Sequence, residues 1–367
     1  MFGSPPGGVG GGYPPPGFMP PPYPPGMRPP FGPPPRRSFG RALFMSVVLI
    51  LLIISILLNI MLMAGDLGGS GGQQTVISNG NGNDKVVVIP LTGVIDDHTY
   101  TRIDRFFKRA EADNSIKAIV LRIDTPGGTV SASDEIYSRI LRYKQERQEK
   151  GQSVPVIVSM GGFATSGGYY AACAGDYLFA EETTITGNIG VLWPNYNFSG
   201  LMQKYGVQDT TIVSSGATFK DAGSPTRPQN SNDMAYMQHL IDVPFARFKD
   251  VVKTGRGKNL KHPIDEIADG KAYPAADAKA AGLIDDIGYL ESAIKYASSK
   301  TGVSNPMVVR YQEPPSFFGL LESDSLFHGG GREQGVTIKI DASAIDRLTS
   351  PQMMYLYRGP QGLGLPR

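Results

Sequence analysis

Runs of β-branched residues alternate with amphipathic stretches through the middle of the chain. Continuous apolar runs predict buried strands at 85–95, 116–124 and 155–160. Shorter strand candidates follow at 176–180, 189–193 and 210–215. Helical patterns occur at 98–112, 131–147 and 230–254, and a helix, a glycine stop and a second helix lie within 275–300. Strands that alternate with helices predict an α/β fold with largely parallel strands.

The N-terminal region has a different composition and predicts a membrane anchor. Residues 1–41 hold about half of the 30 prolines, mixed with glycine, and predict a disordered tail. Residues 42–64 are apolar and long enough for a transmembrane helix, since about 20 residues cross the hydrocarbon core. Arg36, Arg37 and Arg41 precede this run, which places the tail in the cytoplasm and the rest of the chain outside it. Residues 65–84 predict a flexible linker.

Charge and metal-ligating residues exclude several function classes. The net charge of +2 gives no indication of nucleic-acid binding. The single cysteine, Cys173, excludes an intrachain disulfide and a Cys-based zinc site, and its place in a helix favours a buried packing role. The four histidines share no motif spacing. We therefore expect no metal and no cofactor.

The segment 161–174 carries the strongest indication of chemistry. Ser166 follows an apolar strand, is flanked by small residues and opens a predicted helix, as a nucleophilic serine at a strand-to-helix turn does. A helix-capping serine beside packing glycines explains the same local pattern. Gly128 and Gly167 are the candidate N–H donors for an oxyanion, and a tight turn is compatible with that role.

A serine nucleophile needs a base, and no histidine lies between His98 and His239. Lysine is the alternative when burial in an apolar site keeps its amine neutral. Lys220 follows ten uncharged residues, which distinguishes it from the other lysines, although an ordinary surface lysine fits the local sequence as well.

Several ordered blocks resemble signal peptide peptidases of the SppA type, in peptidase family S49. The blocks are IVLRIDTPGGTVSASDEI, VSMGGFATSGGYYAACAGDYLFA, TGNIGVL, SSGATFKDAGSPTRP and GKAYPAADAKAAGLIDDIG, and the likeness runs over 85–300. The resemblance implies a Clp protease/crotonase-like spiral of β-β-α units. It makes Ser166 the nucleophile, Lys220 the base, and Gly128 and Gly167 the oxyanion donors. Asn188 stands where the family usually has a lysine-orienting serine.

The resemblance also sets expectations for partners and substrates. It implies a homo-oligomeric ring, an octamer, in which a neighbour supplies the lysine. Substrates, chiefly signal peptides and other apolar peptides, would bind as an added strand beside Thr129, Val130, Gly190 and Val191. Alternatives are a general membrane peptidase of the SohB type acting on proteins, a crotonase-like acyl-CoA binder and an inactive ring scaffold. Residues 301–367 form an extension of unknown role, in which 336–345 is a strand candidate and 351–359 is apolar enough to dock on the domain or a neighbour.

Overall fold

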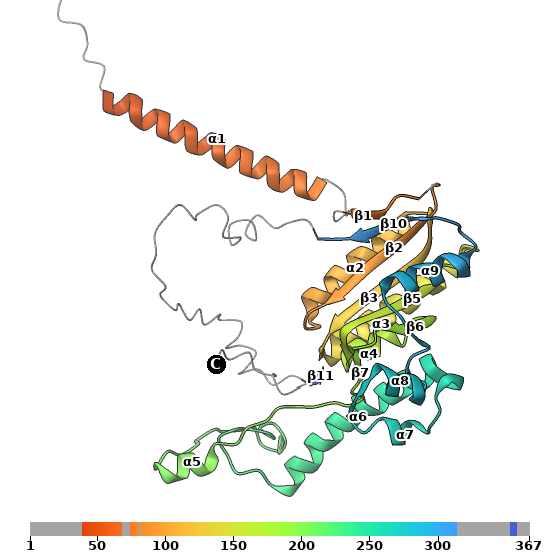
Figure 1. Ribbon diagram of the computed structural model, residues 1–367. Helices are drawn as coiled ribbons and strands as arrows, with labels where there is room; N and C mark the ends of the chain where they lie inside the picture. Colours follow the sequence, from red (N-terminus) through yellow and green to blue (C-terminus); the bar gives the residue numbers. More distant parts are fainter. Residues whose placement is uncertain (1–38, 68–73, 81, 314–352, 358–367) are drawn as a thin grey trace, which may run out of the picture. The chain divides into compact units, whose positions relative to one another are not determined.

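The computed structural model describes residues 39–67, 74–80, 82–313 and 353–357 (Figure 1). The chain divides into two compact units, residues 1–67 and residues 68–367. Residues 1–38 of the predicted tail lie outside the described residues, as does the strand candidate at 336–345.

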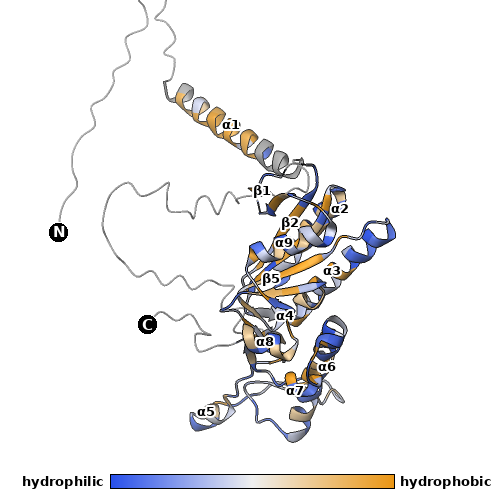
Figure 2. Ribbon diagram, turned by 45° about the vertical axis from the view of Figure 1, so that its right-hand side comes forward, coloured by the Kyte–Doolittle hydropathy of each residue, from blue (hydrophilic) through white to orange (hydrophobic). Residues whose placement is uncertain are grey.

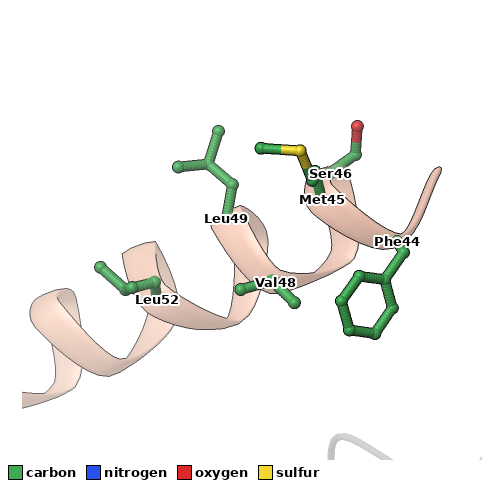
Figure 3. Close-up of a pocket in the computed structure, with 6 residues that line it drawn as sticks. All are labelled: Phe44, Met45, Ser46, Val48, Leu49 and Leu52. Carbon is green, nitrogen blue, oxygen red and sulfur yellow. The ribbon is translucent and has the colours of Figure 1, made fainter. Parts of the chain in front are cut away.

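The first unit contributes one helix, α1 (Phe39–Leu67), which includes the predicted 42–64 segment. Its apolar side chains between Leu43 and Leu58 are exposed, and Figure 2 shows this stretch as hydrophobic. Figure 3 shows six α1 side chains, among them Phe44, Leu49 and Leu52, which line a crevice that belongs to this helix alone. Within the described residues, no helix meets the length and hydropathy that a membrane-spanning helix requires.

The second unit is built on a mainly parallel sheet with the strand order β1-β10-β2-β3-β5-β6-β9. Only β1 pairs antiparallel along this path, and β7 and β8 extend from β5. The strand bounds are β1 (Gln74–Ser78), β2 (Lys85–Thr92), β3 (Ile116–Thr125), β5 (Val156–Thr165), β6 (Tyr177–Ala180), β7 (Ile185–Gly187), β8 (Ala272–Pro274), β9 (Asp286–Ile287) and β10 (Met307–Tyr311). The predicted mixed α/β fold with largely parallel strands is confirmed.

Helices cover both faces of the sheet, which explains why its central strands are apolar on both sides. One face packs against α2 (Asp97–Ala112), α3 (Val130–Glu149), α4 (Gly167–Ala172), α6 (Ser231–Arg256) and α8 (Ala275–Ala281). The other face packs against α9 (Leu290–Thr301), whose Ala293 and Ala297 belong to one buried cluster with Val88 and Val120. The short α7 (Ile264–Ile267) completes the helical side.

Two short strands form a second sheet at the carboxyl ends of β3 and β5. Strand β4 (Gly127–Thr129) follows β3 after one proline, and β11 (Met354–Leu356) pairs with it antiparallel. Thr125 sets this turn: its hydroxyl accepts from Gly127 N at 3.0 Å and donates to Gly93 O. Residues from the far end of the chain therefore lie beside the predicted active site.

Residues 193–230 form an arm that carries α5 (Ser199–Lys204) and leads into α6. Figure 1 shows the arm and the start of α6 projecting from the sheet. Two predicted strands are wrong in this part of the chain: 210–215 is not a strand, and 189–193 makes only one isolated bridge, at Leu192. Among the described residues, the 210–215 segment pairs with no strand, and its Ile212 is 94% exposed.

The sheet extends beyond the predicted domain bounds at both ends. Gln74–Ser78, within the predicted linker 65–84, is strand β1, and Met307–Tyr311, within the predicted extension, is β10. Strand β10 lies between β1 and β2, with Val309 opposite Val87. The linker prediction failed here because composition carries no information about a distant pairing partner.

Candidate active site

Ser166 lies at a sharp turn between β5 and α4. Its backbone has φ 53° and ψ −114°, a conformation that non-glycine residues rarely adopt. The turn is fixed on both sides, because Ser166 N donates to Gly187 O at 2.8 Å and Ser166 O accepts from Tyr170 N at 2.8 Å. The side chain makes no capping hydrogen bond to the helix. The capping explanation therefore does not account for this serine, and its strained turn fits a reactive position.

Gly128 and Gly167 come together beside Ser166. A Cβ added to Gly167 would lie 3.3 Å from Gly128 N, and one added to Gly127 would lie 2.8 Å from Gly167 N and 3.1 Å from Ser166 Cβ. The backbone nitrogens of Gly128 and Gly167 therefore lie close together next to the serine, where α4 begins. Two backbone N–H groups beside a serine are the parts from which oxyanion sites are built.

Close packing explains why these positions are glycines. A Cβ on Gly128 would lie 1.9 Å from Ile95 O, and one on Gly167 would lie 2.3 Å from Ser133 Oγ. Ser133 is buried and donates to Thr129 O at 2.8 Å, so its hydroxyl cannot move away without losing that bond. The sequence analysis assigned no role to Ile95 or Ser133, because each contacts a glycine more than 30 residues later in the chain.

Asn188 lies one residue after Gly187, whose carbonyl holds the serine turn. It has φ 53°, and its backbone N donates to Lys271 O at 2.9 Å. Its side-chain amide N donates to Gly270 O, so the donor group of this asparagine is occupied. Its Oδ1 has no hydrogen-bond partner among the described residues.

Lys220 is not brought to Ser166 within one chain. Its side chain is exposed on the arm, and its amine has no hydrogen-bond or ion-pair partner among the described residues. The neighbouring Asp221 instead forms a paired contact with Arg227, at 2.7 and 3.0 Å. Arg227 also bonds Asp233 at 2.6 Å, which ties the Lys220 segment to the start of α6.

In contrast to Lys220, Lys271 lies on a segment that the fold brings towards this site. It adjoins Ala272, which pairs with Gly187. Its amine lies 3.3 Å from Asp269 and over the Tyr273 ring. Hydrogen bonding to Tyr273 and then to Asp269 raises the pKa of Lys271, so its amine is protonated at neutral pH and cannot accept a proton from serine.

The predicted substrate-binding residues line the strand β11. Thr129 lies opposite Met354, and Val130 N donates to Met353 O at 3.3 Å. On the other side, Leu192 and Met354 exchange backbone hydrogen bonds at 3.1 and 3.0 Å. Gly190 and Val191 lead into Leu192 and are partly buried. A strand thus lies where the sequence predicts that substrate adds, between the stretches after Gly128 and after Gly190.

Cys173 lies apart from this site. Cys173 is buried among core residues, and burial raises the pKa of its thiol to about 12. Within the part of the chain that the structure describes, no three His, Cys, Asp or Glu side chains gather closely enough to hold a metal ion.

Comparison with known proteins shows that this sequence is similar to those of peptidases. The model of peptidase family S49 matches residues 148–304, and that of Clp protease matches residues 77–182. The chain is 30% identical to "Putative protease slr0021" of Synechocystis, over 75% of this chain and 96% of that protein. It is 29% identical to "Putative signal peptide peptidase SppA" of Enterococcus faecium, over 80% and 86%. It is 35% identical to "Putative protease MJ0651" of Methanocaldococcus jannaschii, over 57% of this chain and 65% of that protein.

Proposed function

Since this chain belongs to peptidase family S49 and is a serine endopeptidase with a Clp protease-like α/β domain, we propose that it cleaves peptides with Ser166 as nucleophile and Lys220 as base. One observation carries the proposal. Ser166 occupies a strained strand-to-helix turn beside the N–H groups of Gly128 and Gly167. The finer expectation of a spiral of β-β-α units belongs to the same proposal.

The chemistry needs a base, a nucleophile and an oxyanion site in one place. The neutral amine of Lys220 takes the proton of Ser166 Oγ while Oγ attacks the carbonyl carbon. The negative charge on the carbonyl oxygen is stabilised by Gly128 N–H and Gly167 N–H. The lysine then gives its proton to the departing amine, and water attacks the acyl-serine by the reverse use of the same base.

A second copy of the chain supplies the lysine in this proposal. Lys220 lies on an arm whose apolar side chains are exposed in the single chain. These include Phe198, Leu201, Tyr205, Ile212 and Phe219. Covering them with a neighbouring copy would remove apolar area from water and would bury the amine, which keeps it neutral. In a ring of copies, expected to be an octamer, every arm makes the same heterologous contact with the neighbouring copy. Asn188 Oδ1 of the serine-bearing copy accepts from the incoming amine.

The enzyme is anchored in a membrane in this proposal. The exposed apolar side chains of α1 and the arginines before it support that expectation. The tail then lies in the cytoplasm and the catalytic domain outside it. Apolar peptides in or near the bilayer, signal peptides above all, are the expected substrates. Proteins are the substrates in the alternative of a general membrane peptidase, and an inactive scaffold would have none.

Labelling and subunit mixing test the proposal together. A fluorophosphonate probe should modify Ser166 in the full chain, and Ser166→Ala should abolish both labelling and peptide hydrolysis. Lys220→Ala should lose hydrolysis, while Lys204→Ala, an exposed lysine on the same arm, should keep it. Co-expressed Ser166→Ala and Lys220→Ala chains should regain activity at about a quarter of the sites, because only one random neighbour pairing in four combines an intact serine with an intact lysine.

Each outcome has a defined meaning. If the Lys220→Ala variant still hydrolyses peptides, Lys220 is not the base. An inactive mixture of two folded variants contradicts the sharing of the site between copies. A wild-type chain that neither labels nor cleaves any apolar peptide or protein supports the scaffold.

A further inference from the structure

Asn59 is the most polar side chain that the structure describes on α1. From Leu43 to Leu58 the large exposed side chains of this helix are all apolar. Asn59 is exposed as well. One N–H of its amide donates to Ser55 O at 2.8 Å, while its Oδ1 accepts no hydrogen bond from any described residue. The amide therefore keeps one donor and its acceptor for a partner outside the helix.

The predicted span 42–64 places this amide within the hydrocarbon layer of a membrane. With a rise of about 1.5 Å per residue, Asn59 lies about 9 Å from the middle of the span, and the half-thickness of the hydrocarbon layer is about 15 Å. Lipid tails offer no hydrogen bond, so an amide without a partner is costly there. A neighbouring helix can supply the partner that α1 alone does not.

The amide lies on the same face of α1 as the crevice. At about 100° per residue, Val48, Leu52 and Asn59 lie within about 40° of one another around the helix axis. These positions follow the a and d spacing of a heptad, and an asparagine at an a position fixes the pairing of two helices. The crevice is lined by Val48 and Leu52 together with Phe44, Met45, Ser46 and Leu49 (Figure 3). Such a crevice between side chains receives a side chain of a facing helix.

We propose that the α1 helices of two copies of this chain pack side by side along Val48, Leu52 and Asn59, with the two Asn59 amides hydrogen-bonded to each other. An amide is self-complementary, because the N–H of one copy donates to Oδ1 of the other, so an identical parallel helix satisfies both. The inference rests on the membrane anchor of the proposed function. Two joined anchors keep the chains that they carry near each other, which favours a site shared between Ser166 and Lys220.

Disulfide crosslinking of the full chain in membranes tests this packing. Cys173 is buried, so the unaltered chain should not crosslink and gives the background. With a mild oxidant, Val48→Cys and Leu52→Cys should form linked dimers at least about tenfold faster than Ile50→Cys and Leu57→Cys. The last two positions are matched controls, since they lie about 140–180° away around the same helix, too far from a partner's cysteine for a disulfide.

The role of the amide is tested in the Leu52→Cys chain. Asn59→Leu should weaken the association about three- to tenfold at a fixed ratio of chain to lipid, as expected for hydrogen bonds between helices in membranes. Asn59→Gln keeps an amide and should retain more of the crosslinking. Combining Asn59→Leu with Leu57→Asn moves the amide to the opposite face, so efficient crosslinking should pass from Leu52→Cys to Ile50→Cys.

The outcomes separate this inference from the proposed function. Equal crosslinking at Leu52→Cys and Ile50→Cys overturns the inference, because the helices then meet without a preferred face. Absence of crosslinks in a membrane-held chain overturns it too, as does a crosslinked fraction that Asn59→Leu leaves unchanged. Release of the full chain by alkaline carbonate contradicts the membrane anchor itself and the inference with it. Labelling of Ser166 reports on the peptidase chemistry independently of all these results.

Discussion

Gly167→Ala adds one methyl group where the N–H groups of the candidate site meet. The new Cβ would lie 2.3 Å from Ser133 Oγ and 3.3 Å from Gly128 N. Gly167 is the first residue of α4 and has no left-handed backbone, so alanine fits its conformation. The substitution therefore tests the effect of steric crowding alone, without any contribution from backbone strain.

The expected loss of stability is modest, because two effects oppose each other. Overpacking a close contact costs about 1–3 kcal/mol. Replacing a helical glycine by alanine stabilises the helix by up to about 1 kcal/mol. We expect the free energy of unfolding, measured by urea denaturation, to fall by about 1–2 kcal/mol. Gly200→Ala in α5 is the control, since no atom lies within 4 Å of its Cβ, and it should not destabilise the protein.

Activity should fall much more than stability. Adding Ser133→Ala removes the 2.3 Å contact and should recover most of the lost stability, although the bond of Ser133 to Thr129 O is lost. The methyl group still lies 3.3 Å from Gly128 N, so kcat of the double variant should stay about 10²–10³-fold low, the typical loss for one oxyanion donor. A double variant that recovers stability and full kcat would refute the assignment of Gly128 and Gly167.

Three further predictions concern groups outside this contact. Arg227→Ala frees the segment that carries Lys220, so kcat should fall about ten- to a hundredfold while the thermal midpoint of the domain stays within a degree or so. Burial raises the pKa of Cys173 to about 12, so native protein should resist alkylation at pH 9 until denatured, as mass spectrometry can follow. This raised pKa stabilises the fold below the pKa of the unfolded thiol, and the contribution is lost as pH rises through about 12. Arg139→Ala leaves Asp104 without its buried partner and should lower the free energy of unfolding by about 3–5 kcal/mol in urea titrations. Burial raises the pKa of Asp104, but hydrogen bonds from Lys108 and Arg139 outweigh it and hold the pKa below 3.8, so the difference between variant and wild type should shrink as pH falls through that lowered value.

Local sequence patterns predicted the elements whose partners are close in the chain. The runs at 85–95, 116–124 and 155–160 are central strands, and the helix over 230–254 is α6. The turn at Ser166 was predictable because a strand end, small residues and a helix start are contiguous there. The meeting of Gly128 with Gly167 followed from parallel strands that end at one edge of the sheet.

Features that depend on distant partners were not predictable from such patterns. Strand β1 lies in a glycine-rich stretch and owes its conformation to β10, more than 220 residues later in the chain. The apolar residues of 351–359 indicate docking on the domain or a neighbour, but they do not predict that Tyr355 lies opposite Gly128. Ser133 contributes to the site only because helix α3 places its hydroxyl against Gly167. The surroundings of the proposed base were not predictable for the same reason, since no sequence pattern around Lys220 identifies the residue that its amine contacts.

The separation of Lys220 from its own serine has a consequence for how activity would depend on protein amount. If the site is shared between copies as proposed, a newly made chain without neighbours would hold a serine and an amine that do not meet, and it would not cleave other polypeptides. Catalytic output would then rise more steeply than concentration as copies gather, and dilution would switch it off without any change in covalent structure.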